Sequence, residues 1–411
     1  MSDLLTPIIR AVRKQMGPAI PAVCSAQPDV IAAGLRLARH AAMPALIEAT
    51  SNQVNQFGGY SGMTPGDFAA FLRDVAAEHD LGDVPVILGG SHLGPQAWRA
   101  MPAEAAMAHA ELMVADYVRA GFTKIHLDCF PGCQDEAPRL DDDLAAARAA
   151  RLVRVAEAHA PDPEALCYVI GTSLRGTEET TPQPPDEAAR MLAAHEAAFA
   201  EAGAASAWKR LRGLVAQPGL GFGATQIDRF DMSQPDLLSP VLDGNERLGF
   251  EAHGTDYQPA PVYPDLTRRN FAIFKVGPAL SFAWREALYA LSHIREWMDG
   301  SPHISQGMED LMLERPELWQ SHYHGPARTQ RLLRHFSYAD RIRYYWPQAR
   351  AQVQELCDSL DATGVPQPLL LQYLPPETLA RAARLDLPPA RAILQAHVEE
   401  TLIAYYPEET C

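Results

Sequence analysis

Short apolar runs recur along the first 300 residues and alternate with stretches of helical periodicity. Each run ends in polar residues, glycine or proline, which is typical of strands buried on both faces. Alternation of such strands with helices predicts right-handed βαβ units and a parallel sheet. The eight predicted strands span residues 21–26, 45–50, 84–90, 124–128, 166–172, 214–219, 248–253 and 271–277.

The helical stretches between these runs carry start and stop signals. Thr64 and Pro65 open the stretch 65–79 as an N-cap and a first helical residue usually do. Gly121 follows the stretch 102–120, where a glycine readily takes the left-handed conformation of a C-cap. Eight such units predict an α/β fold, the (β/α)₈ TIM barrel. An open doubly wound sheet of eight strands is the alternative.

The pattern changes at about residue 300. From there the chain has no comparable apolar runs and shows helical periodicity broken by Pro316, Pro347 and Pro366. A length of 411 residues fits a barrel of roughly 250 residues with a sizeable addition. We therefore expect a (β/α)₈ barrel over residues 1–300 and a helical C-terminal extension over 301–411, packed on the barrel or serving a partner interface.

Composition and charge narrow the classes of function. A net charge of −16 argues against a nucleic-acid partner, because an acidic surface repels phosphates. No apolar stretch is long enough for a signal peptide or a membrane span, so we expect no membrane partner. Six cysteines without a C-x-x-C pair favour a cytoplasmic protein with reduced thiols. No lysine follows a glycine, which excludes a P-loop kinase.

Polar residues gather at the predicted C-terminal ends of the strands, where barrel proteins place their working groups. His92 and His253, with a carboxylate such as Asp128, would suit a divalent Zn, Mn or Ni ion that polarises a ketone. The candidate catalytic residues are Asp128, His126 and Ser91. The histidines would equally suit a structural role, in which each caps a strand or bonds a backbone carbonyl.

Candidates for substrate binding lie at neighbouring strand ends. Lys275 and Gly277 stand where the last strand passes into a helix, so an ammonium, backbone N–H groups and the helix dipole would meet a phosphate there. The amides of Asn52, Gln53 and Asn55 suit sugar hydroxyls, and Asp256 is a further candidate for substrate binding. The alternatives are a lysine that only extends from the barrel rim and a loop whose amides satisfy its own backbone.

Long runs of the sequence resemble one family. Over nearly the whole chain they are similar to the non-catalytic subunit family of class II D-tagatose-1,6-bisphosphate aldolase. That family has often been labelled tagatose-6-phosphate kinase and includes D-tagatose 6-phosphate 4-epimerases. The resemblance implies a sugar-phosphate ligand and a class II aldolase catalytic subunit as partner, and we also expect a homo-oligomer. The runs are IEATSNQVNQFGGYSGMTP, ILGGSHLGPQAW, AGFTKIHLD, YVIGT, FEAHGTDYQ, FAIFKVGPALSFAWREALYAL and DRIRYYWP.

The resemblance carries over to some site residues and not to others. The family usually has a carboxylate at the positions of Ser91, Ser173 and Gly221, so three are missing together. Glu178 or Glu179, a few residues downstream, is a candidate to substitute for one of them. Ser91 itself could not transfer the proton, because a serine hydroxyl is too weak an acid or base near neutral pH. The residues that match the family are Asn52, Gln53, Asn55, His92, Asp128, His253, Asp256 and Lys275.

Two functions follow from this comparison. As an accessory subunit, the chain would stabilise a class II aldolase and bind a sugar phosphate without turning it over. As a divalent-metal-dependent D-tagatose 6-phosphate 4-epimerase, it would hold the ion with His92 and His253, use Asp128 as ligand or base, and bind phosphate with Lys275. A changed substrate with altered chemistry is a third possibility. We favour the accessory subunit, because losing one general acid or base typically costs ~10²–10⁴-fold in rate.

Overall fold

The computed structural model describes residues 3–172 and 181–407 and contains a closed barrel of eight parallel strands. β1 pairs with both β2 and β10, which closes the ring and excludes the open sheet. The strands, in their order around the ring, are β1 (Ile20–Cys24), β2 (Ala45–Thr50), β3 (Val86–Leu93), β4 (Lys124–Leu127), β5 (Cys167–Ile170), β6 (Leu211–Val215), β9 (Gly249–Ala252) and β10 (Phe271–Val276).

The sixth strand differs most from its prediction. β6 begins and ends earlier than the run 214–219. Pro218 has no N–H to donate to a ladder, and Gly219 has a φ of 101° that only glycine adopts readily. The chain then forms a hairpin of β7 (Gly221–Phe222) and β8 (Ile227–Asp228), which is too short for any periodicity to reveal.

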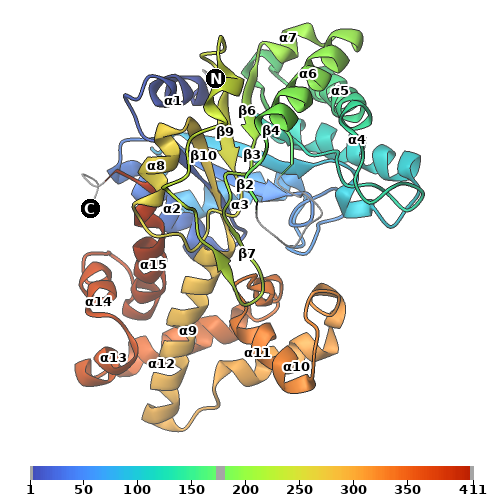
Figure 1. The fold of residues 1–411 in the computed structure, drawn as a ribbon. Coiled ribbons are helices and arrows are strands. Elements are labelled where there is room, and N and C mark those ends of the chain that lie inside the picture. Colours follow the sequence, from blue (N-terminus) through green and yellow to red (C-terminus); the bar gives the residue numbers. More distant parts are fainter. Residues whose placement is uncertain (1–2, 173–180, 408–411) are drawn as a thin grey trace.

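Helices surround the barrel (Figure 1), and α3 begins at the predicted N-cap. The Thr64 hydroxyl accepts from the Asp67 N–H at 3.3 Å, and the Asp67 carboxylate accepts from the Thr64 N–H at 3.0 Å, a capping box. The barrel helices are α2 (Pro28–His40), α3 (Pro65–Glu78), α4 (Ala103–Arg119), α5 (Asp142–His159), α6 (Pro185–Glu201), α7 (Ala205–Trp208), α8 (Val262–Arg268) and α9 (Pro278–Asp299), with 3₁₀ turns η1 (Pro95–Trp98), η2 (Pro163–Ala165) and η3 (Ser239–Leu242).

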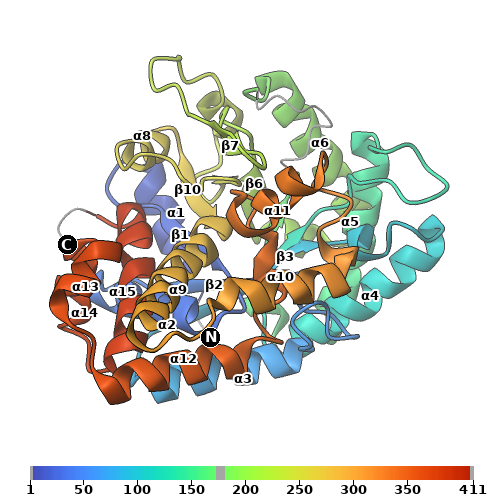
Figure 2. The same ribbon diagram turned by 90° about the horizontal axis from the view of Figure 1, so that it is seen from below.

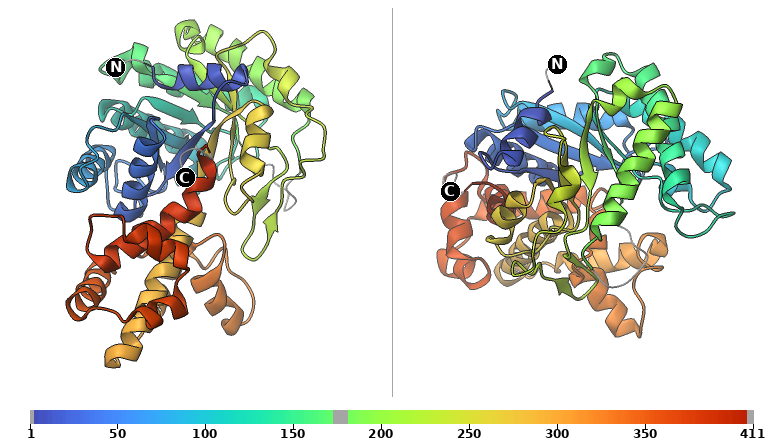
Figure 3. Two further views of the ribbon diagram at one scale, coloured as in Figure 1. Left: turned by 90° about the vertical axis from the view of Figure 1, so that its left-hand side faces the viewer. Right: turned by 45° about the horizontal axis from the view of Figure 1, so that its top comes forward.

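α9 continues beyond the barrel into a group of C-terminal helices at one end of the molecule (Figure 1). Seen from that end, α10 and α11 lie in front of the strands (Figure 2). The opposite end carries α1 (Leu5–Arg13), whose apolar side is buried (Figure 3). The C-terminal elements are α10 (Ile304–Glu314), η4 (Pro316–Leu318), α11 (Ala327–Phe336), η5 (Arg341–Tyr344), α12 (Arg350–Thr363), α13 (Gln367–Tyr373), α14 (Pro376–Ala382), α15 (Pro389–Leu402) and η6 (Ile403–Tyr405).

The helical C-terminal extension of the predicted fold class is thus present, and α15 packs against α2 and α9. Within residues 3–172 and 181–407, no helix combines the length and the apolar composition that a bilayer span requires.

A lysine is buried between two carboxylates inside the barrel. The Lys124 ammonium lies 2.5 Å from the Glu48 carboxylate and 2.6 Å from that of Glu251, and all three side chains are fully buried. Gly89 makes room for Glu48, because a Cβ there would lie 2.8 Å from the Glu48 Cγ. Burial alone would lower the pKa of Lys124, but the two carboxylates outweigh it and raise the pKa. The ammonium therefore stays charged inside the barrel.

We predict that this cation is needed for stability. In Lys124→Met two buried carboxylates would face each other without a counter-ion, so the free energy of unfolding should fall by about 3–5 kcal/mol. Lys209→Met, at an exposed lysine, is the matched control and should change it by less than about 0.5 kcal/mol. Urea denaturation at neutral pH measures both variants, and equal stabilities would contradict the prediction.

Candidate functional site

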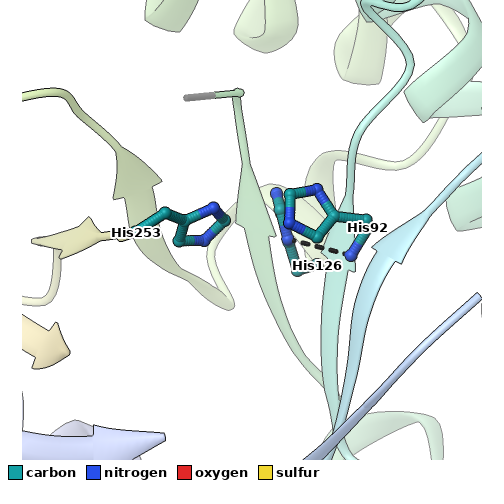
Figure 4. A group of neighbouring side chains, drawn as sticks. All are labelled: His92, His126 and His253. Carbon is teal, nitrogen blue, oxygen red and sulfur yellow. Dashed lines mark hydrogen bonds between the residues drawn. The ribbon is translucent and has the colours of Figure 1, made fainter. Parts of the chain in front are cut away.

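Three histidines meet at the C-terminal ends of the strands. His92 lies near the end of β3, His126 on β4 and His253 directly after β9, and one nitrogen of each lies within 4.8 Å of the others. Figure 4 shows His253 facing the other two from across the site. His92 has a φ of 50°, at a register shift between β3 and β4. Such irregular, strained positions often re-aim a side chain at a functional site.

Carboxylates orient two of the three imidazoles. His92 Nδ1 lies 2.8 Å from an Asp128 oxygen, and His253 Nε2 lies 2.8 Å from a Glu251 oxygen. Each of these nitrogens donates to its carboxylate, so the lone pairs reside on His92 Nε2 and His253 Nδ1. A carboxylate behind an imidazole is the usual support of a metal-ligating histidine. Asp128, predicted as a ligand or a base, here orients His92.

The third imidazole has a different set of partners. His126 Nδ1 accepts from the His92 backbone N–H at 3.1 Å, drawn as a dashed line in Figure 4, and its Nε2 donates to the Gly171 carbonyl at 3.0 Å. His126 therefore stabilises the bend at His92. It could ligate a metal only by giving up the hydrogen bond at Nδ1.

The histidines are neutral near neutral pH. Burial lowers the pKa of all three well below the usual imidazole value, and the ammonium of Lys275 lowers the pKa of His92 and His253 further. Burial also raises the pKa of Asp128. Neutral imidazoles are the form that binds a metal, so no proton has to be displaced from His92 or His253.

A cavity of about 300 Å³ opens onto this cluster, lined by His92 and His253 together with Lys275, Asp256 and Arg343. Lys275 donates to the Ser91 hydroxyl, which is fully buried and lies 3.5 Å from His126 Nδ1. The structure therefore brings the predicted residues His92, His126, His253, Asp128, Ser91 and Lys275 together.

The anion site predicted at Lys275 and Gly277 is already occupied by the chain's own carboxylate. The Gly277 and Ala279 N–H groups at the start of α9 donate to one oxygen of Asp256, at 3.0 and 2.9 Å. The reason is physical: a buried carboxylate needs donors, and a helix N-terminus supplies them. A phosphate cannot use the same N–H groups while Asp256 holds them, so the phosphate site predicted at the Gly277 backbone is corrected. Asp256, predicted to bind substrate, here accepts from the start of α9.

The three predicted amides in the loop after β2 have different surroundings. Asn52 and Gln53 line the cavity. Asn55 does not: its side chain donates to the Ser51 carbonyl and accepts from the N–H groups of Phe57 and Gly59. The loop uses this amide to satisfy its own backbone, which is the alternative role considered for these residues, and substrate binding by Asn55 stays a prediction.

Two of the three positions at which the resemblance implies a carboxylate border the site. Ser91 contacts Lys275, and the Cα of Gly221 would lie 3.5 Å from a Cβ on Gly254, the residue after His253. Ser173, Glu178 and Glu179 lie outside the described residues.

Sequence reasoning missed Arg343 and Tyr344, which line the cavity from η5 in the C-terminal extension. Their run DRIRYYWP is long and distinctive. The run does not follow a predicted strand, so nothing in its position indicated that it belongs to a barrel site.

Comparison with known proteins places the chain in a family. A family model described as D-tagatose-1,6-bisphosphate aldolase subunit GatZ/KbaZ-like matches residues 5–410. A solved structure of a probable tagatose 6 phosphate kinase from Sinorhizobium meliloti 1021 is 43% identical, with a TM-score of 0.87. The match covers 96% of this chain and 100% of that chain.

Two aldolase structures are more distant. The YdjI aldolase of Escherichia coli K12 is 11% identical with a TM-score of 0.45, over 85% of this chain and 95% of that chain. Fructose-bisphosphate aldolase of Campylobacter jejuni is 14% identical with a TM-score of 0.45, over 87% and 93%. Neither likeness carries a functional argument. The family model and the Sinorhizobium structure do, and the chain belongs to the GatZ/KbaZ-like family of D-tagatose-1,6-bisphosphate aldolase subunits, in carbohydrate metabolism.

Proposed function

We propose that the chain is an accessory subunit of a class II D-tagatose-1,6-bisphosphate aldolase, and that it binds a ketohexose phosphate at the barrel mouth without turning it over. One observation carries the proposal: each described carboxylate around the histidine cluster is already held by donors of the protein itself. Asp128 accepts from His92 and Thr172, Asp256 accepts from the start of α9, and Glu251 accepts from His253 and pairs with Lys124.

Proton transfer needs a group of suitable pKa within hydrogen-bond reach of the substrate. Ser91 and Gly221 stand where the resemblance implies carboxylates. Ser91 contacts Lys275, and Gly221 lies beside Gly254, the residue after His253. A serine hydroxyl and a glycine supply no such group near neutral pH. Binding functions survive this loss, because the cavity keeps Lys275, Asn52 and Gln53 along its walls.

The residues present fit a divalent ion such as Zn, Mn or Ni. His92 Nε2 and His253 Nδ1 are the nitrogens with lone pairs, and Asp128 and Glu251 fix their tautomers. His126 is within reach as a third ligand. A bound ion would polarise the ketone of a sugar. The chain's own residues would orient that sugar through the amides at the mouth and through the Lys275 ammonium.

A second candidate function is a metal-dependent D-tagatose 6-phosphate 4-epimerase. The observation that favours it is the pair of oriented, neutral imidazoles, which a purely structural barrel would not need. Lys275, which lines the same cavity, would then face the sugar.

Turnover by the protein alone separates the two functions. We expect no interconversion of D-tagatose 6-phosphate and D-fructose 6-phosphate with Mn²⁺, Zn²⁺ or Ni²⁺, followed by NMR on folded protein. Co-purification with a class II aldolase catalytic subunit should raise that subunit's thermal stability. Interconversion that EDTA abolishes would contradict the accessory role and support the epimerase function. Failure to bind or stabilise any catalytic subunit would count against the accessory role directly.

Cation binding tests the role of Asp128. Asp128→Asn keeps the shape of the side chain but no longer fixes His92 as an Nδ1–H donor to a carboxylate. We expect the affinity for Zn²⁺, measured by calorimetric titration, to fall by about 10- to 100-fold. His40→Gln, at an exposed histidine on α2, is the control and should bind as the unchanged protein does. An unaltered affinity in Asp128→Asn would show that the ion, if bound, does not use His92.

A further inference from the structure

Arg343 is held over the barrel mouth by contacts between the C-terminal extension and the barrel. It follows Asp340, whose buried carboxylate accepts from the Ser281 hydroxyl at 2.6 Å and from Arg285 Nε at 3.0 Å, both on α9. The Tyr257 hydroxyl donates to the Tyr338 carbonyl at 2.7 Å. These bonds attach the segment before η5 to the helix and the loop that border the site.

The ring of Tyr344, the next residue, lies 4.3 Å from the ring of Tyr60 in the loop after β2. The extension is therefore fixed to both sides of the mouth, and Arg343 is presented by a rigid segment.

Within the described residues, the hydrogen-bond partners of the Arg343 guanidinium are neutral, and the Asp340 carboxylate acts on it only through space. It donates to the carbonyls of Ala339 and Asp340 and to the Tyr344 hydroxyl, and it lies over the Tyr344 ring at 4.5 Å. Throughout residues 3–172 and 181–407, no carboxylate forms an ion pair with Arg343 or with Lys275. In a chain of net charge −16, two such cations on one cavity indicate an anionic ligand.

Arg343 also borders a second cavity of about 310 Å³, which shares Cys24, Gln53, Tyr60 and Gly277 with the first. The guanidinium therefore stands at the junction of the two, with the histidine cluster on one side. The N-terminus of α9, the other place for a phosphate, holds Asp256. Lys275 is turned toward Ser91.

We propose that Arg343 is the phosphate anchor of this site, and that the C-terminal extension thereby completes a sugar-phosphate site on the barrel. The proposal rests on the proposed function for the sugar and goes beyond it in naming the group that selects a phosphorylated ligand. A planar guanidinium binds a phosphate through two parallel hydrogen bonds, which suits a terminal phosphate monoester. The sugar end then extends toward His92 and His253.

The test is calorimetric titration in EDTA with three probes: inorganic phosphate, D-tagatose 6-phosphate and D-tagatose. Arg343→Gln should weaken the binding of both phosphates by about 10- to 100-fold and leave D-tagatose unaffected. Arg343→Lys keeps the charge without the planar fork and should give an intermediate loss. Arg350→Gln is the control, because Arg350 is exposed and lines only the second cavity. This variant should bind all three probes with unchanged affinity.

Unchanged phosphate binding in Arg343→Gln would overturn the anchor. An equal loss of phosphate affinity in Arg350→Gln would also overturn it, because it would indicate that the phosphate binds in the second cavity. If Arg343→Gln does not fold, as thermal unfolding would reveal, Arg343→Lys carries the test and must lose several-fold in affinity. Binding of inorganic phosphate through Arg343 without binding of D-tagatose 6-phosphate would uphold the anchor and refute the proposed function. No phosphate binding by the unchanged protein would refute both.

Discussion

The ammonium of Lys124 lies inside the barrel between the carboxylates of Glu48 and Glu251, and the histidine cluster is built above this group. The three residues come from β4, β2 and β9, which are not neighbours in the ring, so their contacts cross the interior. Burial alone would raise the pKa of Glu251, but the charge and hydrogen bond of Lys124, together with other nearby charges, outweigh it and lower the pKa. Glu251 therefore stays ionised and can accept from His253. The position of one imidazole thus depends on a lysine deep in the barrel.

Ser91 and Gly221 lie nearer the mouth than the buried charges. Neither side chain is a carboxylate, and Ser91 contacts Lys275. A site of this composition can bind a metal and an anion without moving a proton.

The sequence predicted the strands well because a strand buried on both faces is a short apolar run whatever its tertiary partners. For the same reason it located His92, His126 and His253, since parallel strands of a barrel end together. The prediction from sequence was undecided for polar side chains that could bind either a ligand or a group of the protein itself. Asn55 satisfies its loop and Asp256 occupies the start of α9, and neither choice is visible without the folded backbone. Arg343 escaped notice because only the tertiary structure brings η5 back to the mouth.

The central claim is that the barrel mouth holds a sugar phosphate between the histidine pair and the C-terminal extension. The most direct measurement is anomalous X-ray diffraction from crystals grown with Zn²⁺ and D-tagatose 6-phosphate. The account predicts an anomalous peak for a zinc ion ligated by His92 Nε2 and His253 Nδ1. It also predicts an unreacted sugar whose phosphate contacts Arg343. A zinc peak elsewhere, or a mouth that contains neither ion nor sugar, would contradict it.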